Sequence, residues 1–304
     1  MKFEITVLGS GSALPTLTRR PSSHFVNCNE RYILIDCGEG TQLQLRKYKL
    51  KFQRIDVICI THLHGDHFFG LVGLLSTMHL LGREKKLTII CPEGLESIIR
   101  MQLEIGGGAY LSFEIEFNEL NYPASKLVFE DNVLEIHCFP LKHRVPTHGF
   151  LIQEKERLYS LDKPAFDHYG LSIAQIPAIR RGEDIEREDG TIIRNKELVL
   201  PKEKPKSYAY CSDTIFRENL TEHVSGVDLM YHEATFLDKD KDKAKKTYHT
   251  TAAQAGQLAK KARVKKLLIG HFSTRYLDVQ GHIDEAGQHF ENVEAAEEGK
   301  VIRI

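Results

Sequence analysis

The sequence predicts an α/β protein in which strands alternate with helices in both halves of the chain. In the first half, the apolar run 55–60 has the length of a buried strand, and apolar residues at helical spacing follow over 68–81. The second half repeats this order, with strands expected at 207–211, 227–231 and 267–270 and helices at 250–262 and 283–297. The 304 residues, 41% hydrophobic and 27% charged, fit one globular domain, 1–304, with a sizeable core.

Composition excludes several classes of protein. There is no run of about 20 apolar residues, so no membrane span is expected, and the N-terminus enters a strand at 2–8 without a signal-peptide segment. The six cysteines form no CxxC pair and lie mostly in apolar runs, which favours a reduced, cytoplasmic protein. The net charge of −1 means that any nucleic-acid binding must depend on local basic patches.

The loop that follows the expected strand 55–60 concentrates candidate metal ligands. Within six residues it carries His62, His64, Asp66 and His67. A short loop between a strand and a helix can aim several side chains at one point. Imidazole and carboxylate groups suit zinc or a similar divalent ion. Four ligands so close in sequence cannot all reach one ion comfortably, so two metals are expected.

Other candidates follow later strands. His143 comes after an expected strand at 132–139, where a further histidine ligand is needed, and His148 is a competing choice that is better explained as structural. Asp213 follows the strand 207–211 and can bridge two metals, although a helix N-cap is the alternative interpretation. Asp36 either orients a ligand histidine or caps a turn.

Residues 155–200 differ in character from the rest. They are charged and irregular, and Ile176 to Ile179 form their one apolar patch. An insertion of this length without a regular pattern tends to be functional or disordered. We interpret it as an inserted, flexible, extended arm.

The loop motif resembles a known signature. Thr61-His62-Leu63-His64-Gly65-Asp66-His67 is similar to the motif of the metallo-β-lactamase superfamily. The resemblance implies a four-layer αββα sandwich and, in most members, a dinuclear metal hydrolase.

The second half resembles one family within that group, ribonuclease Z, the tRNA 3′-processing endonucleases. The resembling segments are His232 to Phe236, His249 to Thr251, and His271-Phe272-Ser273-Thr274-Arg275-Tyr276, with Gly9 to Ala13 in the N-terminal loop. The resemblance implies two Zn²⁺ ions per chain, with Mn²⁺ or another divalent ion as the alternative. It implies that the first ion is held by His62, His64, His143 and Asp213, and the second by Asp66, His67, Asp213 and His271.

The reaction implied by the resemblance is hydrolysis of a phosphodiester in precursor tRNA, not in DNA. Asp66 would orient and deprotonate the attacking water, and His249 would protonate the departing 3′ oxygen. The products would be a tRNA with a 3′-OH and a trailer with a 5′-phosphate. Substrate phosphates would contact Arg19, Ser273, Thr274 and Arg275.

The resemblance also implies that the arm is the exosite that grips the tRNA elbow, and that the protein is a homodimer. Two departures bear on this. Ile176-Pro177-Ala178-Ile179-Arg180-Arg181-Gly182 stands where the family has a Gly-Pro-rich arm motif, and Arg19-Arg20 stands where it has Arg-Asn. The first departure puts the arm's grip on tRNA in question.

Two alternatives remain open from the sequence. One is a small-molecule phosphodiesterase or arylsulfatase-like hydrolase of the same superfamily. The other is a non-catalytic RNA-binding protein with this fold, which a metal content near zero would favour.

Overall fold

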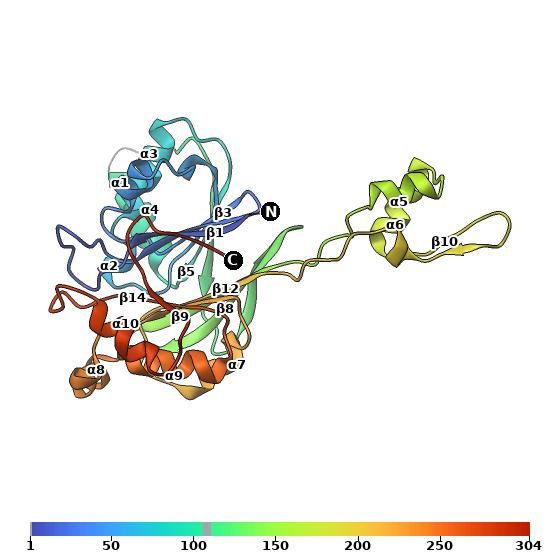
Figure 1. Ribbon diagram of the computed structural model, residues 1–304. Helices are drawn as coiled ribbons and strands as arrows, with labels where there is room; N and C mark the ends of the chain where they lie inside the picture. Colours follow the sequence, from blue (N-terminus) through green and yellow to red (C-terminus); the bar gives the residue numbers. More distant parts are fainter. Residues whose placement is uncertain (1, 106–110) are drawn as a thin grey trace. The chain divides into compact units, whose positions relative to one another are not determined.

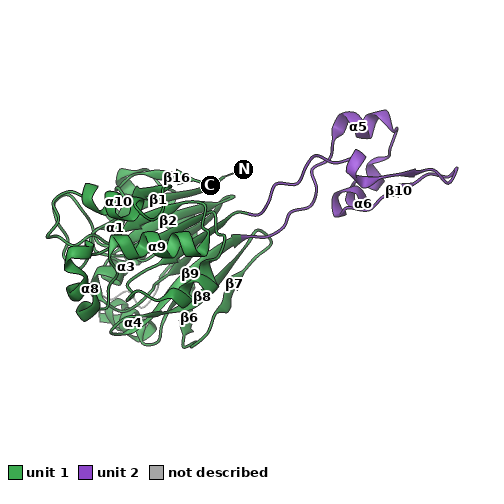
Figure 2. Ribbon diagram, turned by 60° about the horizontal axis from the view of Figure 1, so that its bottom comes forward, with its two compact units in different colours: residues 1–153, 206–304 green, residues 154–205 purple. Residues whose placement is uncertain are grey.

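The computed structural model describes residues 2–105 and 111–304. The chain divides into two compact units. The first comprises the residues up to 153 together with 206–304, and the second comprises 154–205 (Figure 2). No helix in the described part of the chain is both long enough and apolar enough to cross a membrane.

The first unit contains two large sheets, and the described strands of the first lie in the order β16-β1-β2-β3-β4-β5-β6. Their bounds are β1 Phe3–Gly9, β2 Ser23–Cys28, β3 Arg31–Ile35, β4 Ile55–Cys59, β5 Leu87–Pro92, β6 Ile115–Leu120 and β16 Val301–Arg303. Strands β3 to β6 run parallel. Strand β16 pairs with β1, so the two ends of the chain lie near each other (Figure 1).

The second sheet has the order β15-β14-β13-β12-β9-β8-β7. Its strands are β7 Lys126–Glu130, β8 Leu134–Lys142, β9 Pro146–Glu154, β12 Ser207–Cys211, β13 Leu229–Glu233, β14 Leu267–Gly270 and β15 Val293–Ala295. Strands β12 to β15 are parallel. The carboxyl ends of parallel strands meet at one edge, and this edge carries several of the candidate ligands.

Three apolar cores hold the layers together. The central core lies between the sheets and includes Ile5, Val26, Ile136, Phe150 and Tyr208. A second core packs helices on the outer face of the first sheet: α1 Thr41–Lys47, α2 Gly65–Phe68, α3 Leu71–Leu80 and α4 Leu95–Ile105. A third core packs helices on the second sheet: α7 Thr221–Val224, α9 Ala252–Ala262 and α10 Gln280–Gly287. These layers confirm the predicted αββα sandwich (Figure 1).

The second unit has a small core of its own, although the sequence predicted an irregular segment. It contains α5 Lys163–His168, α6 Ile176–Arg181, β10 Ile185–Glu186 and β11 Ile192–Ile193. The buried residues of this core are Phe166, Ile179, Ile185, Ile193 and Leu198. Asn195 ties the chain together because its amide donates to the carbonyls of Ile179 and Glu183. These elements are too short to produce a periodic pattern in the sequence.

The expected last helix, 283–297, is wrong in its extent. Helix α10 ends at Gly287, and residues 293–295 form β15 instead. Val293, Glu294 and Ala295 pair with Leu267, Leu268 and Ile269 of β14. Pairing with an existing strand edge therefore overrides the helical preference of this alanine- and glutamate-rich segment.

Candidate metal centre and pocket

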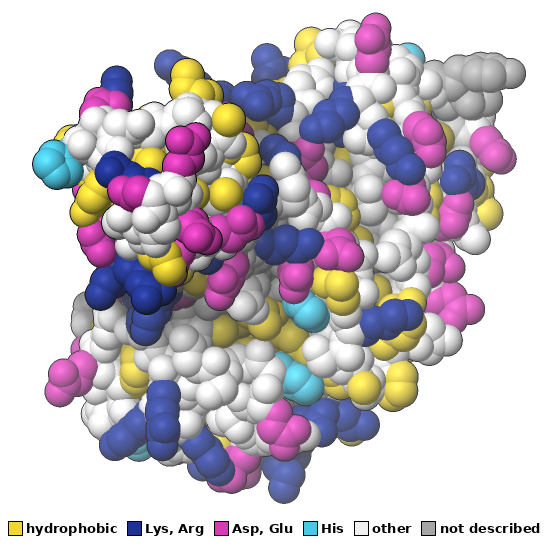
Figure 3. Space-filling model, turned by 90° about the vertical axis from the view of Figure 1, so that its right-hand side faces the viewer, with side chains coloured by type: hydrophobic (Ala, Val, Ile, Leu, Met, Phe, Trp, Pro, Cys, Tyr) yellow, Lys and Arg dark blue, Asp and Glu magenta, His cyan; other side chains and the backbone are white. Residues whose placement is uncertain are grey.

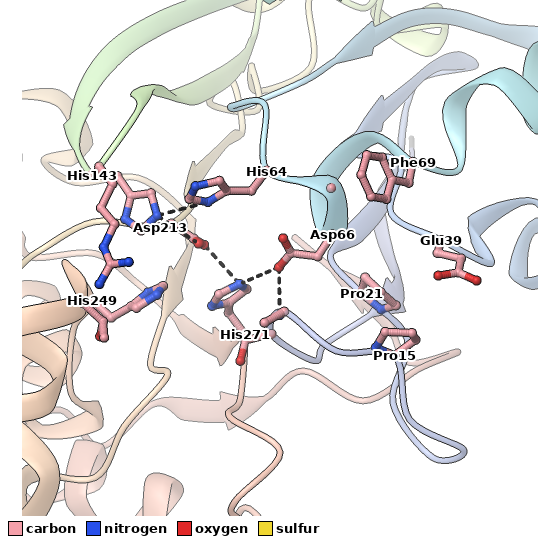
Figure 4. A pocket seen from close by; sticks show the side chains of 15 residues that line it. Pro15, Pro21, Glu39, His64, Asp66, Phe69, His143, Asp213, His249 and His271 are labelled. Carbon is pink, nitrogen blue, oxygen red and sulfur yellow. Dashed lines mark hydrogen bonds and ion pairs between the residues drawn. The ribbon is translucent and has the colours of Figure 1, made fainter. Parts of the chain in front are cut away.

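The predicted ligands meet where loops from the two sheets face each other (Figure 4). The loop after β4 supplies His62, His64, Asp66 and His67, and α2 begins inside it at Gly65. His143 follows β8, Asp213 follows β12, and His271 follows β14. The strand ends therefore bring the four ligands of the loop 62–67 together with three residues that are distant in the sequence, His143, Asp213 and His271.

One group of ligand atoms comes from His62, His64, His143 and Asp213, whose ligand atoms all lie within 4.8 Å of one another. Nδ1 of His64 lies 3.0 Å from Nε2 of His62 and 3.3 Å from Nε2 of His143. The Oδ2 atom of Asp213 lies 3.7 Å from His62 Nε2 and 3.8 Å from His143 Nε2. Three imidazole nitrogens and one carboxylate oxygen thus converge on one point.

A second group comes from Asp66, His67 and His271, which also lie within 4.8 Å of one another. The other oxygen of Asp213, Oδ1, lies 3.2 Å from Nε2 of His271 and 3.6 Å from Nε2 of His67. The two oxygens of Asp213 therefore face the two groups separately. Such an arrangement suits a carboxylate shared between two cations about 3.5–4 Å apart.

The chemistry of these side chains fits divalent metal. Among the described residues, the buried Nε2 atoms of His67 and His271 have no hydrogen-bond partner, and such orphaned atoms are costly unless they bind something. Burial lowers the pKa of His67, but Asp36, Asp66 and Asp213 raise it well above its ordinary value. Carboxylates that hold a proton on a histidine also attract a cation, and mixed nitrogen and oxygen ligands suit zinc.

The histidine rings are oriented through their other nitrogens. Asp36 Oδ2 lies 2.7 Å from Nδ1 of His67 and also accepts from the hydroxyl groups of Thr61 and Tyr210. The Nδ1 atom of His271 lies 2.8 Å from Thr235 Oγ1, and the Nδ1 atom of His143 lies 3.0 Å from the carbonyl oxygen of Tyr248. Fixing one nitrogen directs the other toward the metal. Asp36 thus contacts a candidate ligand, the first of its two predicted roles.

His249 is held by a carboxylate that the sequence analysis did not single out. Its Nδ1 lies 2.9 Å from Oε1 of Glu233, which is fully buried at the end of β13. Glu233 also accepts from the backbone N–H groups of Thr214 and Thr235. Burial lowers the pKa of His249, but Glu233 outweighs burial and raises it to about 9. The position of Glu233 at a strand end was the signal that could have identified it.

Five of the seven candidate ligands line a pocket of about 550 Å³: His64, Asp66, His143, Asp213 and His271. His143 and His249 lie at one end, and Pro15, Pro21, Glu39 and Phe69 lie at the other (Figure 4). Arg144, next to His143 in the chain, and Thr247 also line the pocket.

The predicted substrate contacts Arg19, Ser273, Thr274 and Arg275 are not among the lining residues. The guanidinium group of Arg19 donates to the carbonyl oxygens of Tyr276 and Leu277, and Arg275 lies 3.9 Å from Asp240. Their contact with substrate stays a prediction.

Comparison with known proteins gives matches along the whole chain. The chain is 44% identical over 303 residues to ribonuclease Z of Phocaeicola vulgatus, covering 100% of this chain and 98% of the relative. Ribonuclease Z of Porphyromonas gingivalis is 44% identical over 296 residues, covering 97% of each. Residues 3–176 match a family model described as Anti-Pycsar protein Apyc1.

Solved structures agree with this relationship. The short form of human tRNase Z is 29% identical and superposes with a TM-score of 0.71, covering 98% of each chain. The metallo-β-lactamase fold protein YhfI of Bacillus subtilis is 17% identical with a TM-score of 0.70 over 100% of each chain, which shows the fold alone. The chain belongs to the ribonuclease Z family, whose curated members it matches from end to end, and residues 3–176 also belong to the family that the Apyc1 model describes.

Proposed function

We propose that this metal-dependent tRNA 3′-endonuclease is a two-zinc enzyme that removes the 3′ trailer from precursor tRNA. The observation that carries the proposal is the position of Asp213, whose two oxygens face two separate groups of histidines. Relatives named ribonuclease Z along the full chain support the substrate class. Manganese is the alternative to zinc, and the metal content of the purified protein distinguishes them.

Two bound cations would lower the pKa of water and neutralise charge that develops on the phosphate. Side chains of the protein would orient the water and supply the proton. Burial raises the pKa of Asp66, but His67 and His271 outweigh burial and hold it well below its ordinary value, so this carboxylate stays ionised. One of its oxygens, Oδ2, accepts from the backbone N–H of Ala13 at 2.8 Å. Asp66 is thereby fixed as the acceptor that orients the attacking water.

His249 would hold the proton that the departing 3′ oxygen needs. Its Nδ1 is bonded to Glu233, which leaves Nε2 as the nitrogen available to the pocket. The tRNA would then leave with a 3′-OH, and the trailer would keep a 5′-phosphate.

The first experiment is cleavage of a 3′-extended precursor tRNA by the purified protein, with the cut site mapped. We expect a single cut near the 3′ end of the mature tRNA, and we expect no cut by Asp66→Ala. A small aromatic phosphodiester, bis(p-nitrophenyl) phosphate, is assayed beside it. Rapid hydrolysis of that compound by protein that carries its metal but leaves RNA intact would instead support a small-molecule phosphodiesterase.

We propose that the unit 154–205 is the arm that grips the tRNA away from the cut. It folds around its own core and carries exposed basic side chains, including Arg180, Arg187 and Lys196. Several basic groups are paired, as Arg181 is with Glu183 and Arg194 with Asp184. Basic and acidic side chains are interspersed on the visible face (Figure 3). Recognition of RNA by shape and phosphates needs only such local basic groups.

Removing the arm's core should weaken tRNA binding without changing the chemistry. Ile179 is fully buried in the arm, and Ile179→Ala is expected to cost about 2–5 kcal/mol of local stability. We expect KM for precursor tRNA to rise about tenfold or more, while hydrolysis of bis(p-nitrophenyl) phosphate is unchanged. The exposed Ile173 of the same unit, changed to alanine, is the control. Equal KM for both variants would count against the arm as a binding element.

We also propose a homodimer that forms through the outer face of α4. Ile98, Met101 and Ile105 are spaced to share one helix face, and Met101 and Ile105 are 60% and 82% exposed. Leu80 and Leu81, at the end of the contacting helix α3, are also exposed. A second copy of the chain would cover this apolar surface. The six cysteines all lie in the described part of the chain, where they are buried and form no disulfide, which supports a reducing, cytoplasmic location.

Introducing charge on this face should separate the subunits. Met101→Glu is expected to elute and scatter light as a monomer, because an unpaired carboxylate would be buried between the copies. The exposed Leu158 of the arm, changed to glutamate, is the matched control and should leave the dimer intact. A Met101→Glu protein with wild-type mass would place the interface elsewhere.

A further inference from the structure

An exposed aromatic ring forms one end of the catalytic pocket. Phe69 lines the pocket and is 68% exposed, whereas its neighbour Phe68 is 8% exposed and packs in the core beneath the helices. Phe68 therefore supplies the packing at this point of the chain. The ring of Phe69 is exposed at the pocket, where a bound substrate can contact it.

The ring lies against the metal loop. A Cβ atom built on Gly65 would lie 2.2 Å from Cε2 of Phe69. Gly65 does not have a positive φ, so what glycine provides here is room for the ring, which would have to move aside for a larger residue. The backbone N–H of Phe69 donates to the carbonyl oxygen of Gly65 at 2.9 Å. One part of the ring thus rests on the loop that carries Asp66 and His67.

The residues on the far side of Phe69 are fixed too. The N–H of Gly70 donates to the carbonyl oxygen of Cys37, and a Cβ on Gly70 would lie 2.3 Å from the carbonyl oxygen of Gly38. The backbone of Phe69 is therefore held between two close contacts. Its ring also packs edge-on against the ring of Phe68, with the ring centroids 5.0 Å apart, so it loses less conformational freedom than an unsupported side chain when another ring stacks on it.

Phe69 and His249 lie at opposite ends of the pocket, with Asp66 and Asp213 between them (Figure 4). The end with His249 also carries Arg144, a cation suited to phosphate. The end with Phe69 carries Pro15, Pro21 and the carboxylate of Glu39, so it offers apolar surface to a base but no cation to a phosphate. If His249 serves the departing 3′ oxygen, the nucleotide that loses the trailer lies at its end. The strand then continues toward Phe69.

We propose that Phe69 stacks on the base of the first trailer nucleotide and so positions the scissile phosphate over the metal ligands. This inference rests on the proposed tRNA 3′-endonuclease function. Stacking on an aromatic side chain is tolerant of sequence because every base has a π face. Such stacking suits an enzyme whose precursor substrates have trailers of different sequence, since the ring would bind any base without discriminating between bases.

The test is a double-mutant cycle between the ring and the base. Wild-type, Phe69→Leu and Phe69→Tyr proteins cleave three precursors: one unmodified, one abasic at the first trailer nucleotide, and one abasic at the last tRNA nucleotide. We expect Phe69→Leu to lower kcat/KM on the unmodified precursor by about 5- to 100-fold. Wild-type protein should lose a similar factor on the trailer-abasic precursor. Phe69→Leu should lose nothing more there, and Phe69→Tyr should behave as wild type.

The same coupling should appear in binding. In a His249→Ala background, which slows cleavage, Phe69→Leu should weaken retention of the unmodified precursor on a filter but not of the trailer-abasic one. Metal content per chain is measured for every variant, so that disturbance of the Gly65 loop is detected separately from loss of the ring.

The results distinguish failure of the stacking proposal from failure of the proposed function. Independent, multiplicative effects of the two changes, or no effect of Phe69→Leu, would overturn the stacking proposal. Coupling to the last tRNA nucleotide instead of the first trailer nucleotide would overturn the assigned direction of the strand. Failure of the metal-replete wild-type protein to cut the unmodified precursor would overturn the proposed function itself, which is a different result from cleavage without coupling.

Discussion

Replacing Asp213 by alanine is expected to remove both metal ions and abolish cleavage. Each of its oxygens faces a different group of histidines, at 3.7 Å from His62 and 3.2 Å from His271. Losing Asp213 therefore takes one ligand from each site and leaves the group of His62, His64 and His143 without any carboxylate to neutralise a cation. Substituting a residue that only hydrogen-bonds to a metal ligand lowers metal affinity by about 10- to 100-fold. Substituting a ligand that both sites share should lower the affinity more.

The measurement is metal content per chain by mass spectrometry after gel filtration, with circular dichroism to verify folding. Asp36→Asn provides the graded comparison because Asp36 contacts only His67 of the ligands. It should weaken one ion within the range of about 10- to 100-fold. Asp167→Asn, an exposed position in the arm, should leave metal content unchanged. Two equivalents of metal in Asp213→Ala would exclude Asp213 as the bridge.

Much of the fold and of this site was predictable from local sequence. The loop from His62 to His67 can be recognised as a candidate metal site because its potential ligands are close together in the sequence and follow an apolar strand. Asp213 was predictable because it lies just after a strand of a parallel set, and such strand ends meet at one edge. His271 also follows such a strand, but only the family resemblance identified it as a ligand. The sandwich follows from strands and helices that alternate in both halves.

Contacts between distant loops were not predictable in the same way. Glu233 reaches His249 only because the chain returns to place Phe236 beside Thr251, with α8 (Lys241–Thr247) folded in between. The exposure of Phe69 could not be predicted from the sequence either, since either of two adjacent phenylalanines after a metal loop is expected to be buried in the core. Which of the two phenylalanines is exposed depends on how helices α2 and α3 pack against the sheet. The arm's core is likewise assembled from isolated apolar residues whose spacing has no period.

The pairing of His249 with Glu233 predicts the largest effect on pH dependence. Burial alone would lower the pKa of His249, whereas Glu233 raises it to about 9. Bound divalent cations would lower that value, so the carboxylate is needed to keep the imidazole protonated near neutrality. A group that acts as an acid supports activity below its pKa, and activity falls as pH rises through it. Glu233→Gln should therefore move the alkaline limb of kcat to lower pH.

Glutamine keeps the shape of the side chain but only one acceptor oxygen, whereas the N–H groups of Thr214 and Thr235 donate to Oε1 and Oε2 of Glu233 respectively. Circular dichroism of the variant therefore accompanies the pH profile, so that a loss of folding is told apart from the loss of the charge. The exposed Glu222, changed to glutamine, is the control and should leave the pH profile unchanged. An unshifted alkaline limb in Glu233→Gln would mean that a different group titrates there.

Removing the imidazole tests the role more directly. His249→Ala is expected to lower kcat by about 10²- to 10⁴-fold, the range of a general acid. A ligand atom of His249 lies near those of Asp213 and His271, but these two residues keep their other candidate ligand partners in the variant, so the metal content should stay at the wild-type level. A precursor with a 3′-phosphorothiolate at the cut should restore much of the lost rate, since a departing sulfur needs no proton. If His249→Ala lost the same factor on both precursors, His249 would act by holding the pocket or the metal, and the proton would have to come from another group. Rescue by sulfur would instead place the leaving oxygen at the His249 end of the pocket, which is the orientation that brings the first trailer base to Phe69.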